Sequence, residues 1–435
     1  MPGTAIARAP SARPPLGFVS LLALGVNGII GVGIFFAPRE VAAAVPGWRG
    51  LLVYLLVTIL VVPTGLVFAR LGRAFPEDGG PYLYARAAFG PRAAFAVGWT
   101  TYVSALFSTA TVLVGLVDSS AAALGIGSSA GRLAAALALL TVLTFALSRG
   151  LRISAVTWSV VTVLKSLPLV VLPLFALFGT RVAQPGSAAP AAAESALLAA
   201  ALPVLFALQG FEVVPLPAAQ VRNPHRTVPL ATVGSLVLVA CLYVALHATC
   251  VFALPDLAHD DLPLAHAAGV LGGHTFYVLV ATTTTVSAFG IVVGMLAMTP
   301  RYLAPLGRED ALGFGLDHQS ERAVPLRAFV VTYPLLVAIL MANAVWGSIG
   351  NLLALSSLSV TLQYAVTAGA LFVLSSRGSA GLSRRDRWVA PLAFLSCGLL
   401  LFGASRFEIP VVAAMVALGF LVRALRPRTA RTLPS

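Results

Sequence analysis

Two charged side chains lie inside apolar stretches of the sequence, where a charge is costly. Lys165, in VTVLKSLPLV, is the only lysine in the chain, and Glu212 lies in LFALQGFEVV. Ionisable residues within membrane-length apolar segments are rare, and they mark ion, proton or substrate pathways. A carboxylate there can take up and release a proton, whereas an ammonium group needs a partner or must lose its proton. We therefore predict functional roles for Lys165 and Glu212, and a carboxylate such as Glu212 suits proton transfer.

Two apolar segments also contain residues that interrupt a helix. The first, GVNGIIGVGIFFAP (25–38), has glycines in the middle of an otherwise helical run, although each costs about 1 kcal/mol relative to alanine. The second, ALPVLFALQGFEVVPLPAAQ (201–220), holds one glycine and three prolines. Non-helical backbone at membrane depth is tolerated only where it lines a cavity or is buried in protein. The breaks therefore predict a ligand site, unless the glycines serve only close helix packing.

The backbone groups that a break frees determine which ligand it can bind. Free N–H groups suit a carboxylate, helped by the helix dipole, and free C=O groups suit an ammonium group, so a zwitterion fits both. A hydroxyl of the third span is a further candidate, although hydroxyls at this depth commonly bond a carbonyl of their own helix or a neighbour. The predicted binding residues are Ile30, Gly31, Val32, Gly33, Ile34, Ala207, Leu208, Gly210, Phe211 and Thr109.

The composition predicts the elements that position these residues. Of the 435 residues, 59% are hydrophobic and only 10% charged, whereas soluble domains carry about 25% charged residues. The apolar runs are about 20 residues long and do not alternate, so they predict membrane-crossing helices rather than barrel strands. We predict an all-α integral membrane protein with about twelve transmembrane helices. Their approximate centres are Ile30, Thr58, Ser104, Leu140, Lys165, Leu208, Val239, Ser287, Leu335, Ser359, Cys397 and Ala414.

The basic residues predict the orientation and argue against a nucleic-acid partner. The net charge is +13, but the arginines are scattered in small groups between the apolar runs. The loops of one side hold only Arg39, Arg49, Arg132, Arg181 and Arg406, and the other 22 arginines fall on the opposite side. The positive-inside rule then places both chain ends in the cytoplasm. The three cysteines lie in apolar stretches without metal-ligand spacing, so we expect no metal site.

The two interrupted segments are spans one and six of the predicted twelve. They occupy corresponding positions if the first ten helices form two repeats of five. That arrangement is typical of transporters whose substrate site lies between two discontinuous helices near the membrane midplane. We predict a single transmembrane domain over 1–435, with the first repeat at 16–178, the second at 194–375 and two further helices at 388–425.

Four motifs resemble the amino acid–polyamine–organocation superfamily. GIIGVGIFFAP resembles its glycine-rich first helix, and RLGRAFPEDGGPYLYARAAFGPRAAFAVGW resembles its segment joining helices two and three. LFALQGFE with RNPHRTVPLA resembles the sixth helix and the next loop, and MTPRYLAPLGREDALG resembles the region after helix eight. The resemblance covers about residues 16–330. It implies a bacterial amino acid permease with a LeuT-like five-plus-five inverted repeat and broken helices 1 and 6.

The resemblance also implies roles for the two charged residues. Some relatives carry a lysine at the position of Lys165, where its ammonium group takes the place of a sodium ion, and this argues against sodium coupling. In relatives, the glutamate that matches Glu212 is linked to proton coupling or to pH sensing.

The sequence departs from the family pattern at two positions. Val32 stands where a small polar residue is common, which removes a possible hydroxyl contact. Leu208 stands where an aromatic residue often gates the pocket. A gate would then be weaker here, or Phe206 or Phe211 would supply it.

We therefore expect a secondary active amino acid transporter of the bacterial cytoplasmic (inner) membrane that works by alternating access. Transport would be proton-coupled symport or exchange, independent of sodium and without a cofactor, with an amino acid, protons and membrane lipid as partners. One alternative is a polyamine or cationic amino acid exchanger, and another is a non-transporting substrate sensor of the same fold. A membrane enzyme is disfavoured, because no cluster of metal-binding or nucleophilic residues stands at a bilayer edge. The transported amino acid, the direction of transport and the oligomeric state stay open.

The substitution Lys165→Ala tests the charge in span five. We expect the variant to insert and fold but to lose most or all transport, because its mid-span cation is gone. The measurement is uptake by the purified protein in proteoliposomes, normalised to the amount of folded protein. Uptake at the wild-type rate would remove Lys165 from the mechanism.

Overall fold

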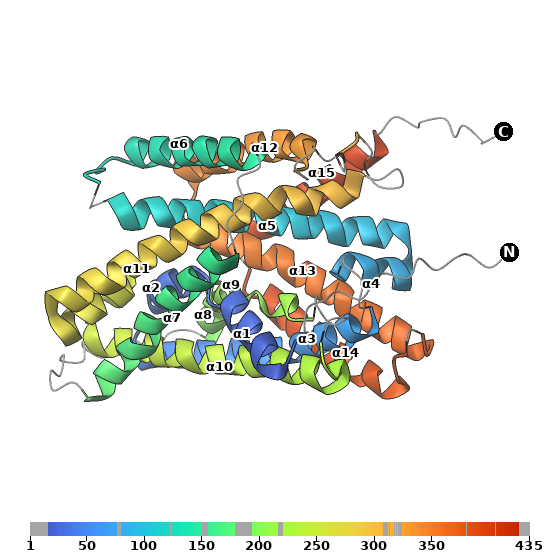
Figure 1. Ribbon diagram of the computed structural model, residues 1–435, viewed down its shortest axis with the longest axis horizontal. Coiled ribbons are helices and arrows are strands. Elements are labelled where there is room, and N and C mark those ends of the chain that lie inside the picture. The colour runs from blue at the N-terminus through green and yellow to red at the C-terminus, as the bar shows by residue number, and fades with distance from the viewer. Residues whose placement is uncertain are drawn as a thin grey trace.

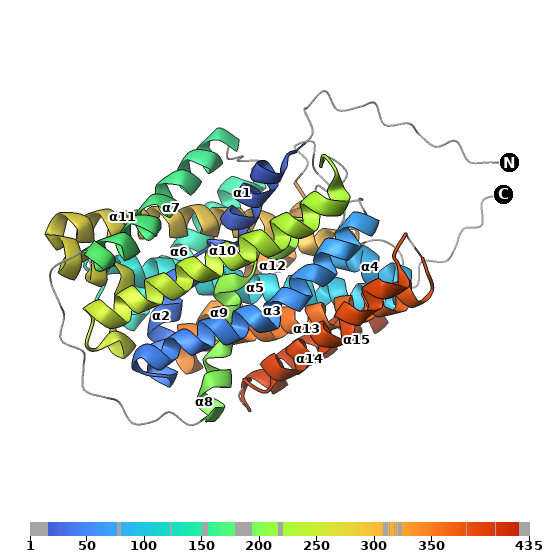
Figure 2. The ribbon, with the colours of Figure 1, turned by 90° about the horizontal axis from the view of Figure 1, so that it is seen from below.

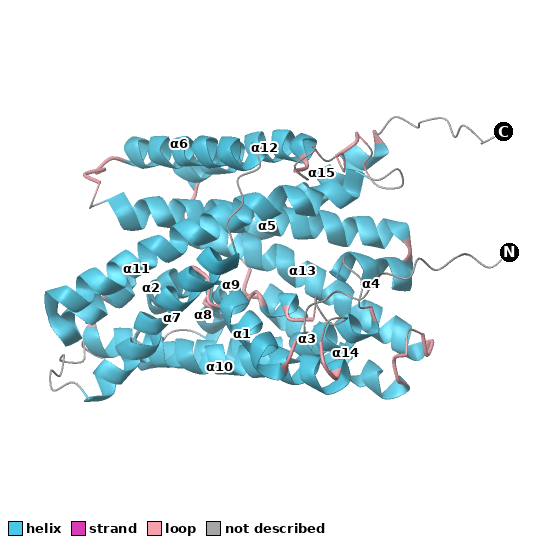
Figure 3. Cartoon of the chain, viewed as in Figure 1, coloured by secondary structure: helices cyan, strands magenta, loops and turns pink. Residues whose placement is uncertain are grey.

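The protein is a bundle of long helices with short connections (Figures 1 and 3). Its computed structural model describes residues 16–75, 80–121, 124–149, 155–178, 194–215, 221–307, 312, 314–316, 318, 320, 324–379, 381–404 and 406–425. Within this part of the chain, the one β-bridge joins Leu16 and Val221. In chain order, with 3-10 helices labelled η, the elements are α1 (Phe18–Ile29), α2 (Gly33–Ala44), η1 (Gly47–Arg49), α3 (Gly50–Ala74), α4 (Gly80–Phe89), α5 (Pro91–Ala121), α6 (Ser129–Ser148), α7 (Ala155–Phe178), α8 (Glu194–Ala199), α9 (Ala201–Leu208), η2 (Phe211–Val213), α10 (Pro224–Ala253), η4 (Leu257–His259), α11 (Pro263–Leu303), η5 (Ala304–Gly307), α12 (Leu326–Trp346), α13 (Ile349–Ser376), η6 (Arg384–Trp388), α14 (Val389–Leu401) and α15 (Glu408–Ala424).

The helices confirm the prediction of an all-helical membrane protein. Among the described residues, eight helices are long and apolar enough to cross a membrane, or nine if the bent pair α1–α2 counts as one span. Eleven of the twelve predicted centres fall inside helices, and the twelfth, Ile30, falls at the break between α1 and α2. However, α14 and α15 have only 13 and 17 residues. The count of twelve spans and the division into two repeats therefore stay predictions.

Helices α5 and α13 lie at the centre of the bundle. They run side by side in Figure 1. In the apolar stretch of each helix, 83% of the residues of α5 and 67% of those of α13 are buried, which are the largest shares among the spans. Helices α6 and α12 pack together on the other side of α5, and only a minority of their residues are buried. Their exposed side chains include Val142, Phe145, Val330 and Met341, as expected of a surface in contact with lipid. On the opposite side of the bundle, α10 packs along α3 (Figure 2).

Both predicted helix interruptions are confirmed. Helices α1 and α2 meet at an angle of 52°, and residues 30–32 separate them. In the second interrupted segment, α9 ends at Leu208, and η2 begins at Phe211. Between them, Gly210 has a φ of 112°, in the left-handed region that glycine adopts without a steric penalty. Glycine is therefore required at this position of the second break.

The two breaks pack directly against each other. A Cβ atom on Gly210 would lie 2.2 Å from the carbonyl O of Gly28, and a Cβ atom on Gly28 would lie 3.0 Å from the carbonyl O of Gly210. A Cβ atom on Gly33 would lie 2.5 Å from the Cα atom of Ala207. These distances are too short for any side chain, so Gly28, Gly33 and Gly210 allow the broken helices to approach closely.

Gly31 differs from the other glycines of the first break. A Cβ atom there would meet no atom nearer than the carbonyl O of Ile29, at 3.8 Å. The glycines of this motif therefore differ in their surroundings. Gly28 and Gly33 serve close packing, whereas Gly31 does not, and its role in a ligand site stays a prediction.

The substitution Gly210→Ala tests this packing. We expect it to lower the free energy of unfolding by about 2–4 kcal/mol, because alanine is strained at this φ and its methyl group collides with the Gly28 carbonyl. Thermal unfolding of the purified protein in detergent is the measurement. Gly31→Ala is the matched control, and its unfolding midpoint should stay near that of the wild type. Equal midpoints for Gly210→Ala and the wild type would show that the two breaks do not pack in this way.

Candidate substrate site between the broken helices

Gly31 is the accessible residue of the first break. It is partly exposed, whereas Ile30 and Val32 on either side of it are buried. Its N–H group donates to the carbonyl O of Ile29 at 2.7 Å, and the hydroxyl of Tyr243 on α10 donates to the same carbonyl at 3.1 Å. The backbone turn is thus fixed from the side of α10, with Gly31 at its open edge.

The predicted residues that follow the first break are part of the helix packing. Gly33 and Ile34 begin α2 and are buried. Gly33 lies against Ala207 of α9, and both Ala207 and Leu208 are buried. The structure therefore brings the predicted residues of the two breaks together, with most of their side chains directed into protein.

Glu212 closes the second break. Its Oε2 atom accepts a hydrogen bond from the Gly210 N–H at 2.8 Å and another from the Tyr364 hydroxyl at 3.2 Å. The carboxylate thus satisfies a backbone donor that the break frees, and it also contacts the hydroxyl of Tyr364 on α13.

Phe211 belongs to an aromatic cluster behind the break. Its side chain is fully buried, and its ring centroid lies 6.0 Å from that of Phe68 and 5.5 Å from that of Tyr364. Phe206, the other candidate gate, is 9% exposed at the end of α9. In the conformation described here, both phenylalanines pack as core residues, and the gating role stays a prediction.

Thr109 lies on α5 and faces α11. The Thr109 side chain is fully buried, and its hydroxyl donates to the carbonyl O of Ala105 at 2.7 Å. The hydroxyl oxygens of Thr109 and Thr299 lie 2.8 Å apart. A second pair of hydroxyls joins α5 to α13, where the Oγ atoms of Ser108 and Ser356 lie 2.6 Å apart. These pairs link the central helix to the two helices beside it with neutral polar groups.

Lys165 lies in α7, and its side chain is outside the described part of the structure. Its predicted role in ion coupling therefore stays a prediction.

Sequence analysis missed two tyrosines that hold the breaks in place. Tyr243 bonds the first break and Tyr364 bonds the second. Both lie in apolar spans, where a buried phenol hydroxyl needs a polar partner. That requirement is a usable sequence signal, but it does not say which backbone group the hydroxyl reaches.

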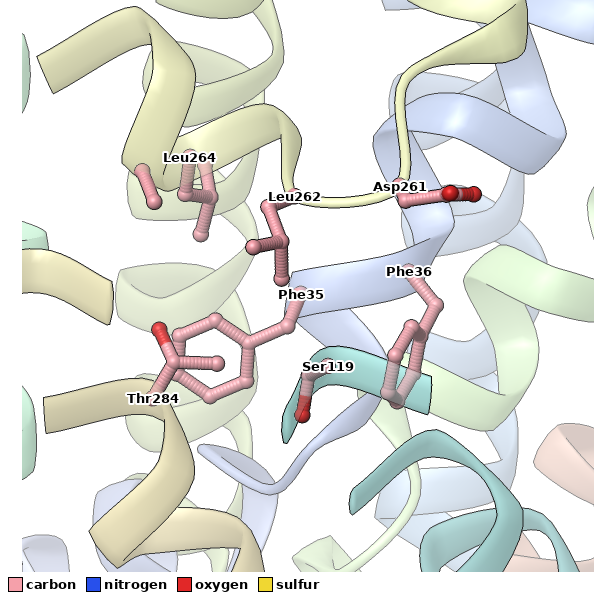
Figure 4. A pocket seen from close by; sticks show the side chains of 8 residues that line it. Phe35, Phe36, Ser119, Asp261, Leu262, Leu264 and Thr284 are labelled. Atoms are coloured by element: carbon pink, nitrogen blue, oxygen red, sulfur yellow. The ribbon is translucent and has the colours of Figure 1, made fainter. Parts of the chain in front are cut away.

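The first turn of α2 is closed by aromatic packing. A small pocket there is lined by Phe35, Phe36, Ser119, Asp261, Leu262, Leu264, Ala265 and Thr284 (Figure 4). The Phe36 ring fills the space beside Gly115. A Cβ atom on Gly115 would lie 2.2 Å from the Cζ atom of Phe36. Both phenylalanines are nearly buried. The α2 end of the bundle therefore offers no wide opening along these residues.

Two adjacent charged residues in the middle of α2 attach this helix to separate elements. Arg39 forms an ion pair with Asp261, in the connection between α10 and α11. The Glu40 carboxylate packs against Gly350 in the first turn of α13, where a Cβ atom would lie 2.6 Å from its Oε2 atom. A carboxylate at the N-terminal end of a helix is favoured by the helix dipole. The two side chains thus connect α2 to both neighbours at once.

The described residues contain no group of three or more His, Cys, Asp or Glu side chains that could hold a metal ion.

Comparison with known proteins supports a transport function. A family model described as amino acid permease matches residues 16–422. A protein of Mycobacterium tuberculosis described as an uncharacterized transporter is 29% identical over 443 aligned residues, which cover 97% of this chain and 94% of that protein. These matches indicate a transporter rather than an enzyme.

Two further relatives carry more specific names. The chloroplastic cationic amino acid transporter 9 of Arabidopsis thaliana is 30% identical over 325 residues, 68% of this chain and 56% of that protein. Cationic amino acid transporter 4 of Homo sapiens is 26% identical over 390 residues, 84% of this chain and 60% of that protein. Since the family model spans almost the entire chain and the helical bundle agrees with it, this protein belongs to the amino acid permease family of the amino acid–polyamine–organocation superfamily.

Proposed function

We propose that this permease is a secondary active transporter that moves an amino acid across the bacterial cytoplasmic membrane, with both chain ends in the cytoplasm. One observation carries the proposal above all others. The two broken helices pack against each other and leave the Gly31 backbone beside open space, one helical turn from the Gly28–Gly210 contact. Broken helices at membrane depth supply the backbone donors and acceptors of a substrate site.

The amino acid binds through its two charged ends. Its carboxylate lies at the start of α2, where free N–H groups and the helix dipole favour a negative charge. Its ammonium group lies at the C-terminal ends of α1 and α9, where the dipoles have the opposite sign. Thr109 and the residues of the second break then surround the substrate side chain.

A neutral amino acid is the leading substrate class. The polar side chains that α5 and α13 share near the centre are hydroxyls and amides, such as the Thr101–Gln363 pair at 2.7 Å. Glu212 already accepts two hydrogen bonds from the protein. A cationic side chain in a buried pocket needs a carboxylate of its own, and no second carboxylate lies within the two breaks.

The names of two relatives favour a second candidate, a cationic amino acid or a polyamine. For that substrate, Glu212 would have to exchange its protein donors for the extra ammonium group. A substrate sensor of the same fold is the remaining alternative, and it would bind an amino acid without moving it.

Alternating access requires that the ends of the site open in turn. The α2 end corresponds to the outer side, and it is closed by the Phe36 packing and by the Arg39–Asp261 ion pair. Opening moves α2 away from the α10–α11 connection and from the first turn of α13. The proposed cycle is coupled to protons through Glu212 or to exchange of a second substrate. Lys165 supplies the positive charge that a sodium ion would otherwise provide.

Uptake by the purified protein in proteoliposomes tests the proposed function. Labelled neutral amino acids, cationic amino acids and polyamines are each offered under a proton gradient, a sodium gradient or a counter-loaded substrate. We expect a neutral amino acid to accumulate with protons or counter-substrate and not with sodium alone. Accumulation of only cationic compounds would favour the second candidate, and a requirement for sodium would contradict the coupling scheme. Binding without uptake, by folded protein, would favour the sensor.

Glu212→Gln tests the proton-coupling role. Glutamine can still accept hydrogen bonds from Gly210 and Tyr364, but it cannot carry the proton, so we expect the pH dependence of uptake to flatten. Tyr364→Phe is the matched control, because it removes one hydrogen bond and keeps the carboxylate, and its uptake should stay pH-dependent. The measurement is the initial uptake rate across a pH series. An unchanged pH profile in Glu212→Gln would leave this residue only its structural bond to Gly210.

A further inference from the structure

The connection between α13 and α14 presents an unusual concentration of arginines. Its 3-10 helix η6 reads RRDRW, and Arg384 and Arg385 are exposed, while Arg387 is partly exposed. We propose that these three arginines bind the phosphate group of an anionic membrane lipid. This site is separate from the proposed substrate site and does not depend on it.

The acidic residue of η6 is already engaged by the protein. Asp386 is buried, and its Oδ1 atom pairs with the Nε atom of Arg70 at 3.2 Å. The Nη1 atom of Arg70 also donates to the Asp386 carbonyl O at 3.1 Å, and Arg73 approaches the carboxylate at 4.0 Å. The Asp386 carboxylate therefore neutralises the arginines at the end of α3, not those of η6.

The same carboxylate fixes the shape of the turn. Its Oδ2 atom accepts hydrogen bonds from the Ser383 N–H at 2.8 Å and from the Ser383 hydroxyl at 3.0 Å. This reciprocal cap holds η6 in one conformation on the end of α3. The arginine backbones are therefore held in place before a ligand binds, which lowers the entropy lost on binding.

The three arginines have no acidic partner among the residues that the structure describes. The Arg387 guanidinium lies over the Trp388 ring, 5.0 Å from its centroid, and no ion pair is formed by Arg384 or Arg385 within that part of the chain. Three uncompensated positive charges thus stand within four consecutive residues. Guanidinium groups form bidentate hydrogen bonds with phosphate, so a phosphate oxyanion fits this group.

The residues after η6 place it at the membrane surface. Trp388 is 65% exposed, as is typical of tryptophans at the membrane–water interface. The next turns of α14 expose Leu392, Phe394 and Leu395 at 57%, 60% and 61%, which is a surface suited to lipid tails. The arginines therefore lie one to two turns from a lipid-facing surface, at the depth of the headgroups. This position favours a phospholipid over a soluble anion or a nucleic acid.

A lipid titration of the full-length protein in detergent tests the proposal. The probes are dioleoyl phosphatidylglycerol, dioleoyl phosphatidylcholine and inorganic phosphate, and the readout is the lipid concentration that gives half of the maximal shift in unfolding temperature. We expect phosphatidylglycerol to act at a lower concentration than phosphatidylcholine. The variant R384Q/R385Q/R387Q should need about tenfold more phosphatidylglycerol or more.

The variant R92Q/R222Q/R226Q is the matched control, because it removes three other exposed arginines and the same total charge. Its half-maximal concentration should stay within about twofold of the wild type, since it leaves η6 intact. Equal weakening in both variants would show general charge attraction and would overturn the proposal. A wild-type protein that responds equally to both lipids would overturn it too, as would inorganic phosphate that reproduces the shift. If the triple η6 variant does not fold, the single variant R385Q is titrated in its place, and no weakening in it would contradict the proposal.

Discussion

The contact between the two broken helices is the constraint on which the rest of the structure depends. Interrupted backbone cannot face lipid, because its unpaired polar groups would lose their hydrogen bonds. Here each break covers the other, since Gly28 lies against Gly210 and Gly33 lies against Ala207. The long helix α13 packs against α9 of this pair, and α5 packs along α13. Room is then left at Gly31, where we propose that the substrate binds.

Glu212 connects the shape of the second break with the proposed chemistry. Its carboxylate accepts a hydrogen bond from Gly210, the residue whose left-handed conformation makes the break. A hydrogen bond to a charged acceptor is stronger than one to a neutral acceptor. Proton binding at Glu212 would weaken this bond, and proton release would strengthen it. In the proposed mechanism, protonation and the conformation of the break are therefore linked, and each changes the free energy of the other.

Ion pairs join separate elements at the two ends of the bundle. At the α2 end, Arg39 and Asp261 join a broken helix to the α10–α11 connection. At the other end, Arg70 and Asp386 join η6 to α3, a helix that itself packs against α9 and α10. In the proposed mechanism, the Arg39–Asp261 pair separates when α2 moves, because Asp261 lies outside α2.

The sequence by itself determined that the chain is a helical membrane protein and where two of its spans are interrupted. These features are local, because hydropathy, glycine and proline act within one segment. It also indicated Glu212, since a carboxylate beside a break is rare at membrane depth. Only the tertiary structure decided that Gly28 and Gly33 serve packing while Gly31 does not, and that Phe211 packs among Phe68 and Tyr364. It likewise brought the hydroxyls of Tyr243 and Tyr364 to the breaks. These outcomes depend on which spans meet and at what distance, and the order of residues along one span does not contain that information.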